Sequence, residues 1–212
     1  MLKTFVPYLQ AMENIQHITL ATAPFPSIEY VMCIKLCETY RVDLKEKFIK
    51  QSNRNRYHIA GPNGLQTLIV PLEHRQLFDT KTHLLKIDYS ERWQNQHWRS
   101  LTTAYNRSPF FEFYADEIKK TIMHRFEFLS DFNNATLQFI CKHFKLPLPI
   151  ESDIQISQLM DLRFVSSAKN NLQTTKIELK PYLQIVKSKY DFISNLSILD
   201  LLFNAGPYSL KG

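Results

Sequence analysis

The sequence is poor in glycine, with only 4 glycines in 212 residues. Phosphate-binding loops of nucleotide enzymes need glycines at fixed spacings, because the backbone has to approach the phosphates closely. Neither GxGxxG nor GxxxxGK[ST] occurs anywhere in the chain. These absences exclude the dinucleotide-binding fingerprint and the P-loop as the source of any nucleotide binding.

Long apolar runs, metal-binding motifs and paired cysteines are also missing. No run of 18 apolar residues and no basic-then-apolar leader occurs, so we expect no membrane insertion and a cytoplasmic location. The 3 cysteines form no CxxC pair and favour reduced thiols. Without HxH, HExxH or GxSxG, the sequence predicts no metal site, no cofactor and no serine-hydrolase elbow.

The composition is that of a globular protein with a mild positive charge. Hydrophobic residues make up 44% of the chain and charged residues 22%, which is enough to build a sizeable core. The 26 basic and 20 acidic side chains leave a net charge of +6. This charge favours anionic partners such as phosphates, nucleotide-linked sugars, nucleic acid or a membrane surface, but it is too small to choose among them.

The order of the expected elements indicates an α/β fold. A strand at residues 17–21, a helix that starts near Ser27 and a strand at 40–44 form the usual opening of an α/β domain. We expect a single domain over 17–212 after an extension at 1–16, with a mixed β-sheet in the N-terminal half and packed α-helices in the middle and C-terminus. The other expected strands are 48–59, 65–71 (after a turn at 61–64), 84–88, 154–159 and 176–179, and the other expected helices are 90–105, 108–130, about 137–144 and about 195–206.

The segment from Lys50 to Arg56 concentrates hydrogen-bonding side chains. If it is extended, Arg54 and Arg56 point the same way, and each offers a planar fork of donors suited to phosphate or carboxylate. Gln51 and Asn55 would lie on the other face, where their amides can bond sugar hydroxyls. The alternative is a solvated edge strand whose basic row prevents aggregation.

Two helical stripes carry further candidates. His97 stands among Trp93, Leu101 and Tyr105 at helical spacing, and it is either a general base or an ordinary core histidine bonded to a neighbour. In the last helix Ser197, Asp200 and Asn204 share the only polar face. That face is a wall of an enclosed site, a narrow exposed stripe, or a buried aspartate that caps a nearby loop.

Several blocks together resemble the WbqC-like protein family of bacteria, in the order in which the family has them. They span roughly residues 17 to 208. The blocks are PFPSIEY at 24–30, KQSNRNR at 50–56 with NG at 63–64 and VP at 70–71, QHWRSL at 96–101 with AY at 104–105, SPFF at 108–111, and NLSILDLLFN at 195–204. In many relatives the first block begins with a Gln-Pro pair, and here Thr22-Ala23-Pro24 stands at that place.

The resemblance implies a role in surface-polysaccharide or O-antigen biosynthesis, and a transferase that places glycine or a similar acyl group on a sugar. The substrate would be a phosphorylated or nucleotide-linked sugar, with nucleic acid an unlikely partner. Together with the residues above, it predicts that Arg54 and Arg56 hold a phosphate or carboxylate. The remaining assignments are His97 and Asp200 as catalytic residues and Gln51, Asn55, Tyr105 and Asn204 as substrate-binding residues. The alternative function is a non-catalytic module that binds nucleic acid or glycan through the basic segment at 50–58.

Overall fold

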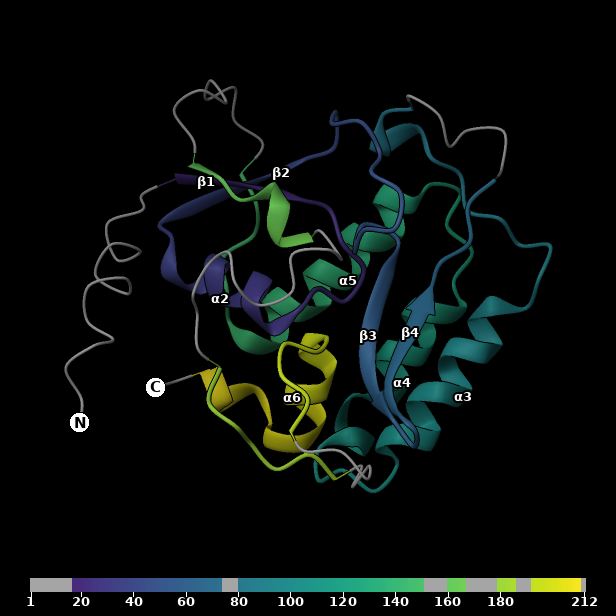
Figure 1. Cartoon of the computed structure of the whole chain (residues 1–212), viewed down its shortest axis with the longest axis vertical. Helices are drawn as coiled ribbons and strands as arrows, with labels where there is room; N and C mark the ends of the chain where they lie inside the picture. Colours follow the sequence, from purple (N-terminus) through teal and green to yellow (C-terminus); the bar gives the residue numbers. More distant parts are fainter. Residues whose placement is uncertain (1–16, 74–79, 151–159, 167–178, 186–191, 211–212) are drawn as a thin grey trace.

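The computed structural model describes residues 17–73, 80–150, 160–166, 179–185 and 192–210 (Figure 1). The extension expected at 1–16, the strand expected at 154–159 and most of the strand expected at 176–179 lie outside these residues. Within them, helices and strands build an α/β fold, as the sequence predicts.

A parallel sheet forms from the first two strands and a late one. Strands β1 (His17–Ala21) and β2 (Thr39–Asp43) are joined by helix α2 (Ile28–Leu36), which Ser27 caps through a hydrogen bond from Tyr30 N. Strand β5 (Met160–Asp161) pairs with the other side of β1, so the order is β2-β1-β5. β1 is therefore the central strand of this sheet, and ligands in open α/β sheets bind beyond the carboxyl ends of the strands.

The second sheet is a hairpin. Strands β3 (Arg56–Gly61) and β4 (Gly64–Ile69) pair antiparallel around the turn residues Pro62 and Asn63. Gly64 has a φ of 102°, a conformation that suits only glycine without strain. The turn and the returning strand expected from the sequence are thus confirmed, but parallel and antiparallel pairings lie in two separate sheets.

The long extended segment expected at 48–59 is wrong in its first half. Residues 50–55 form turns and a bend, Gln51 has a left-handed φ of 56°, and β3 begins only at Arg56. Arg54 and Arg56 therefore do not share one face of a strand. The alternation of charged and amide side chains in this segment is typical of a strand. The backbone turns instead, and the side chain of Arg54 reaches a buried partner, Glu46.

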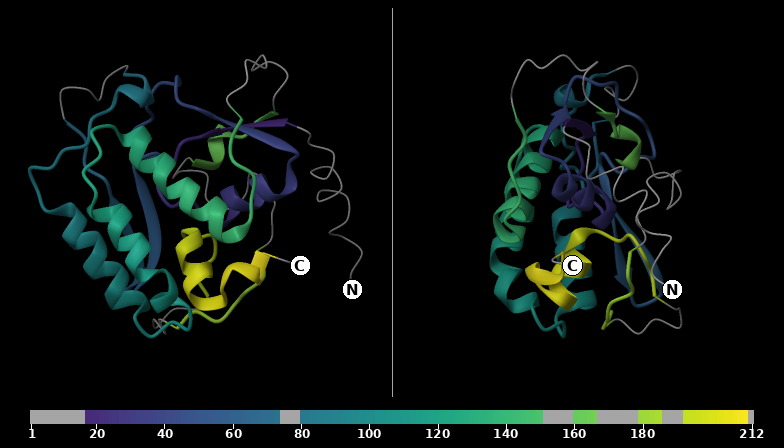
Figure 2. Two further views of the ribbon diagram at one scale, coloured as in Figure 1. Left: turned by 180° about the vertical axis from the view of Figure 1, so that it is seen from behind. Right: turned by 90° about the vertical axis from the view of Figure 1, so that its left-hand side faces the viewer.

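Three helices lie side by side behind the hairpin (Figure 2). They are α3 (Trp93–Tyr105), α4 (Phe111–Met123) and α5 (Leu129–Phe144). A single helix is expected at 108–130, but α4 ends at Met123, and the last residues of that range, from Leu129, belong to the start of α5. Sequence pattern hides this break, because the apolar stripe continues at helical spacing and no glycine or proline interrupts it.

Two further expectations need correction. The helix expected from residue 90, with Ser90 in a position to cap it, begins only at Trp93: the cap position is held by Arg92 without a side-chain hydrogen bond, and Ser90 N bonds Asp88 Oδ1. The strand expected at 84–88 is replaced by a short 3-10 helix (Thr82–Leu84) and by isolated bridges, such as that between Leu72 and Ile87. Among the described residues, the pairings of this segment are single bridges rather than a ladder.

The C-terminal helix α6 (Ile198–Ala205) is almost wholly buried, as its apolar sequence predicts. Ser197 caps its start, and Gly206 ends it with a φ of 76°. The helix lies between α2 and the hairpin (Figure 1) and packs against both. Two short 3-10 helices, η4 (Arg163–Ser166) and η5 (Pro207–Leu210), complete the described elements, and none of the described helices is long and apolar enough to cross a membrane.

Candidate functional site

The loop that follows β1 holds a strained residue. Phe25, between Pro24 and Pro26, has a φ of 37°, which is a genuine outlier for a bulky side chain. Its peptide groups are fixed on both sides, because Phe25 N donates to Thr136 Oγ1 (3.2 Å) and Phe25 O accepts from Ser197 Oγ (2.8 Å). Strain of this kind persists only where the surroundings enforce it, and it gathers at binding and catalytic sites.

The segment before β3 is held beside this loop by buried polar contacts. Arg54 is 1% exposed and donates through Nε and Nη2 to both carboxylate oxygens of Glu46 (2.7 and 2.8 Å). Asn133 Nδ2 donates to Arg54 O (2.9 Å), and Asn53 N donates to Ser166 O (2.6 Å). Arg54 thus anchors the segment to the protein interior through its side chain and its carbonyl, and Arg56 and Asn53 take no part in that anchoring through their side chains.

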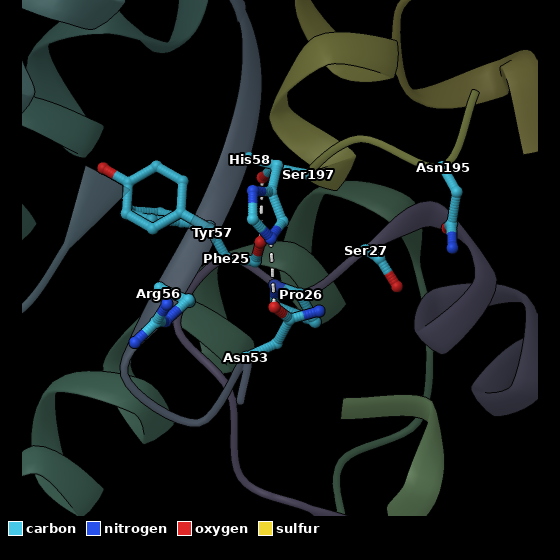
Figure 3. Close-up of a pocket in the computed structure, with 9 residues that line it drawn as sticks. All are labelled: Phe25, Pro26, Ser27, Asn53, Arg56, Tyr57, His58, Asn195 and Ser197. Atoms are coloured by element: carbon cyan, nitrogen blue, oxygen red, sulfur yellow. Dashed lines mark hydrogen bonds between the residues drawn. The ribbon is translucent and has the colours of Figure 1, made fainter. Parts of the chain in front are cut away.

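Between the strained loop and this segment lies a small recess of about 200 Å³, counting its space open to solvent (Figure 3). Polar side chains from three parts of the chain line it together with Phe25, Pro26 and Tyr57. They are Ser27, Asn53, Arg56, His58, Asn195 and Ser197. The recess lies among the loop after β1, the start of β3 and the residues just before α6, so no single stretch of sequence encodes it.

Arg56 gives the recess a free cationic donor. Its Nε atom is buried and has no hydrogen-bond partner among the described residues, and burial lowers the pKa of its guanidinium. A buried donor without a partner is costly, so such atoms normally meet a ligand or an ordered water. The donor geometry of a guanidinium fits a phosphate or a carboxylate.

His58 is the titratable neighbour of Arg56 in the recess. Its Nε2 is 3.1 Å from Asn53 Oδ1, so Nε2 donates and Nδ1 accepts from Thr67 Oγ1 at 3.0 Å (Figure 3 draws the Asn53 contact). Burial and then the charge of Arg56 lower the pKa of His58, which keeps the ring neutral at pH 7. The recess therefore holds one fixed positive charge and one neutral imidazole.

Other unsatisfied polar atoms lie close to the same segment. Among the described residues, the buried atoms without a hydrogen-bond partner include Arg54 Nη1, Asn55 Oδ1, Asn133 Oδ1 and Ser166 Oγ. Asn133 bonds Arg54 O, Asn55 follows Arg54 in the chain, and Ser166 O accepts from Asn53 N. The polar groups here therefore exceed what the described residues satisfy, as expected beside a wet binding site.

His97 does not line the recess. Its Nε2 donates to Ile69 O (3.0 Å), and its Nδ1 accepts from Tyr57 O–H (3.1 Å). The ring is 2% exposed, and burial lowers its pKa to about 4. His97 thus supports Tyr57 from behind, while the Tyr57 ring forms a wall of the recess. The catalytic role that the sequence predicts for His97 stays a prediction.

The burial of His97 makes stability depend on pH. Because its folded pKa of about 4 lies below the ordinary 6.5, the unfolded chain binds a proton first as the pH falls. Stability is complete above pH 6.5 and is lost by about 3 kcal/mol between pH 6.5 and 4, at 1.36 kcal/mol per pKa unit. In urea unfolding, His97→Gln should lose less stability than wild type over this interval; an unchanged pH slope would contradict the assignment.

Asp200 and its neighbours form a buried network rather than a wall of the recess. Asp200 Oδ1 accepts from Tyr105 O–H (2.7 Å), and Oδ2 accepts from Tyr182 O–H and Gln184 Nε2 (3.0 Å for Gln184). Asn204 Oδ1 accepts from Ile185 N (3.2 Å). These bonds tie the segment 182–185 to α6, so the geometry favours the capping alternative, and the substrate-binding roles of Tyr105 and Asn204 stay predictions.

The predicted residues are thus not brought into one recess. Only Arg56 and, from the polar face of the last helix, Ser197 line it. Gln51 is exposed in the turn before β3, and Asn55 bonds Val70 through both its side chain and its carbonyl. Sequence reasoning missed Phe25, Asn53 and His58. The placement of His58 could have been foreseen, since residues 56 and 58 share a strand face.

Comparison with known proteins adds one finding. The model of the WbqC-like protein family matches residues 23–167. The chain belongs to the WbqC-like protein family. No curated protein and no solved structure matches it. The matched part of this WbqC-like chain includes the strained loop, the segment before β3 and η4, whereas Asp200 and Asn204 lie beyond it.

Metal-ligating side chains and cysteines were the remaining candidates for chemistry in this WbqC-like chain. Among the residues that the structure describes, no three histidine, cysteine, aspartate or glutamate side chains gather as metal ligands would. Cys33, Cys37 and Cys141 are free, and burial raises the pKa of each thiol. Such thiols are poor nucleophiles, because the thiolate is the reactive form.

Proposed function

We propose that this protein is a cytoplasmic transferase that moves an acyl group, glycine or one similar to it, onto a phosphorylated or nucleotide-linked sugar for surface-polysaccharide or O-antigen assembly. Family membership supports the pathway, and the recess supports the substrate class. The observation that carries the proposal is Arg56, which lines a small polar recess and whose buried Nε has no hydrogen-bond partner among the described residues.

In this scheme Arg56 holds the phosphate or carboxylate, and Asn53 orients a hydroxyl or an amide. The attacking hydroxyl or amine of the sugar adds to the acyl carbonyl, loses its proton and expels the group that carried the acyl. Neutral His58 lines the recess, and in this scheme its Nδ1 accepts that proton once the Thr67 hydroxyl, which donates to Nδ1, turns away. His97 acts through Tyr57 as a positioning residue.

The non-catalytic alternative depends on a continuous basic row at 50–58, and that row is not formed. Arg54 is buried against Glu46 and does not line the recess, and β3 begins only at Arg56, so Lys50, Arg54 and Arg56 do not line one strand face. A small anion recess with a titratable neighbour fits a sugar phosphate better than it fits a nucleic-acid backbone, which needs an extended basic surface.

Arg56→Gln tests the anion site. Wild-type protein is titrated by calorimetry with UDP-glucose, GDP-mannose and inorganic phosphate. Loss of a charge-assisted hydrogen bond costs about 1.5–3 kcal/mol, so Arg56→Gln should weaken the binding about 10- to 100-fold. Arg107→Gln removes an exposed arginine and the same charge, and it should bind like wild type.

Equal affinity in wild type and Arg56→Gln would refute the anion site. Transferase activity is followed separately, by mass spectrometry of the sugar after incubation with activated glycine. A sugar that gains a glycyl group with wild type but not with His58→Phe supports the scheme. Binding without any acyl transfer would instead favour the non-catalytic module.

A further inference from the structure

The anion recess is too small for a whole sugar nucleotide. Without the space open to solvent it measures only about 10 Å³, whereas sites for ligands of that size measure roughly 300–1,000 Å³. If the phosphate is held by Arg56, the sugar must lie elsewhere. A second recess, which measures about 560 Å³ on the same basis, lies between the hairpin residues 61–67 and helix α3.

The two recesses are linked by one hydrogen bond. Thr67 lines the second recess, and its Oγ1 is 3.0 Å from Nδ1 of His58, which lines the first. The two residues are partners across the β3–β4 ladder. The linings of the two recesses therefore meet at His58 and Thr67 on the β3–β4 hairpin.

Contacts within the protein hold the hydrogen-bonding groups of the second recess in place before any ligand binds. Gln66 Nε2 donates to Ser100 Oγ (2.9 Å), which leaves the Ser100 O–H free to donate outward. A Cβ at Gly61 would lie 2.8 Å from Gln66 Oε1, so the absence of a side chain at Gly61 is what lets the amide lie against the turn. Held amides and hydroxyls of this kind suit the hydroxyls of a sugar.

Arg99 adds the single charge of this lining. It is exposed on α3, and no ion pair or hydrogen bond engages its guanidinium among the described residues. Pro62 and Leu65, which is 59% exposed, offer an apolar surface for the C–H face of a sugar ring. One free guanidinium among neutral polar groups fits a sugar that bears one carboxylate.

We propose that the recess between the hairpin turn and α3 binds the saccharide, and that Arg99 selects sugars that carry a carboxylate. This rests on the proposed function, because it extends the anion site at Arg56 to the rest of the same substrate. Gln66 and Ser100 bind the ring hydroxyls, and Arg99 binds the carboxylate as a charge-assisted, bidentate pair.

The test is titration of wild type with D-glucuronate and with D-glucose, followed by saturation-transfer NMR. Glucuronate should bind more tightly than glucose. Arg99→Gln should weaken glucuronate binding about tenfold and leave glucose binding unchanged. Gln66→Leu should weaken binding of both sugars. Arg107→Gln, the charge control, should match wild type, and thermal melts establish that each variant is folded.

Three outcomes would overturn the inference. They are equal binding of glucuronate by wild type and Arg99→Gln, unchanged binding of both sugars in Gln66→Leu, and no binding of either sugar by wild type. Arg56→Gln separates the two sites. If Arg56→Gln alone abolishes glucuronate binding, the carboxylate lies in the small recess, and the inference fails while the anion site stands. A different result, in which Arg56→Gln leaves UDP-glucose binding unchanged, would refute the proposed function.

Discussion

Glu46→Ala is expected to destabilise the protein by about 3–5 kcal/mol, the usual result of leaving a buried charge without its partner. The side chains of Arg54 and Glu46 are 1% and 7% exposed, and both oxygens of Glu46 accept from the guanidinium. Without Glu46, Arg54 keeps its charge in a site that water barely reaches. Urea unfolding at pH 7 measures the loss.

Glu127→Ala is the matched control. It removes a salt bridge of 2.6 Å to Lys86, but these side chains are 62% and 39% exposed. Exposed pairs contribute about 0–1 kcal/mol, so the same substitution should cost little there. A second variant, Glu46→Leu with Arg54→Met, removes both charges and should recover most of the stability. Equal effects of Glu46→Ala and Glu127→Ala would show that the buried pair does not hold the segment.

Asp200→Ala is expected to cost about 3 kcal/mol, since it leaves the hydroxyls of Tyr105 and Tyr182 and the amide of Gln184 without their common acceptor. Each buried donor without a partner costs about 1–3 kcal/mol, and partial relaxation offsets some of the sum. The segment 182–185 should loosen first, because two of the three donors belong to it. Hydrogen exchange and thermal melts follow both effects.

Asp116→Ala provides the comparison, because Asp116 is exposed on α4 and its loss should change stability by less than about 0.5 kcal/mol. Asp200→Asn separates charge from shape. Burial raises the pKa of Asp200, so the ionised form opposes folding, and wild type loses this part of its stability as the pH rises through the folded pKa. Asp200→Asn should lose that dependence. A wild-type melting temperature for Asp200→Ala would refute the network.

The sequence by itself determined the elements whose signals are local. The β-α-β opening, the cap at Ser27, the hairpin turn at 61–64 and the buried helix stopped by Gly206 each follow from a few neighbouring residues. Capping hydroxyls, positive-φ glycines and apolar periodicity act within one or two turns of chain, so they are visible in sequence alone. Family membership, which the whole pattern carries, was visible in the same way.

Only the tertiary structure decided the site. Pattern placed Arg54 beside Arg56 on a strand face, but Glu46 draws Arg54 into the interior and the backbone turns at Gln51. Likewise His97 and Asp200 look like site residues because they are polar among apolar neighbours, yet each is satisfied by groups from other elements. Phe25 becomes strained through Thr136 and Ser197, 111 and 172 residues away in the chain. A polar side chain in an apolar helix must find a partner, and sequence cannot say whether that partner is a ligand or the protein itself, because the partners come from distant parts of the chain that only folding brings together.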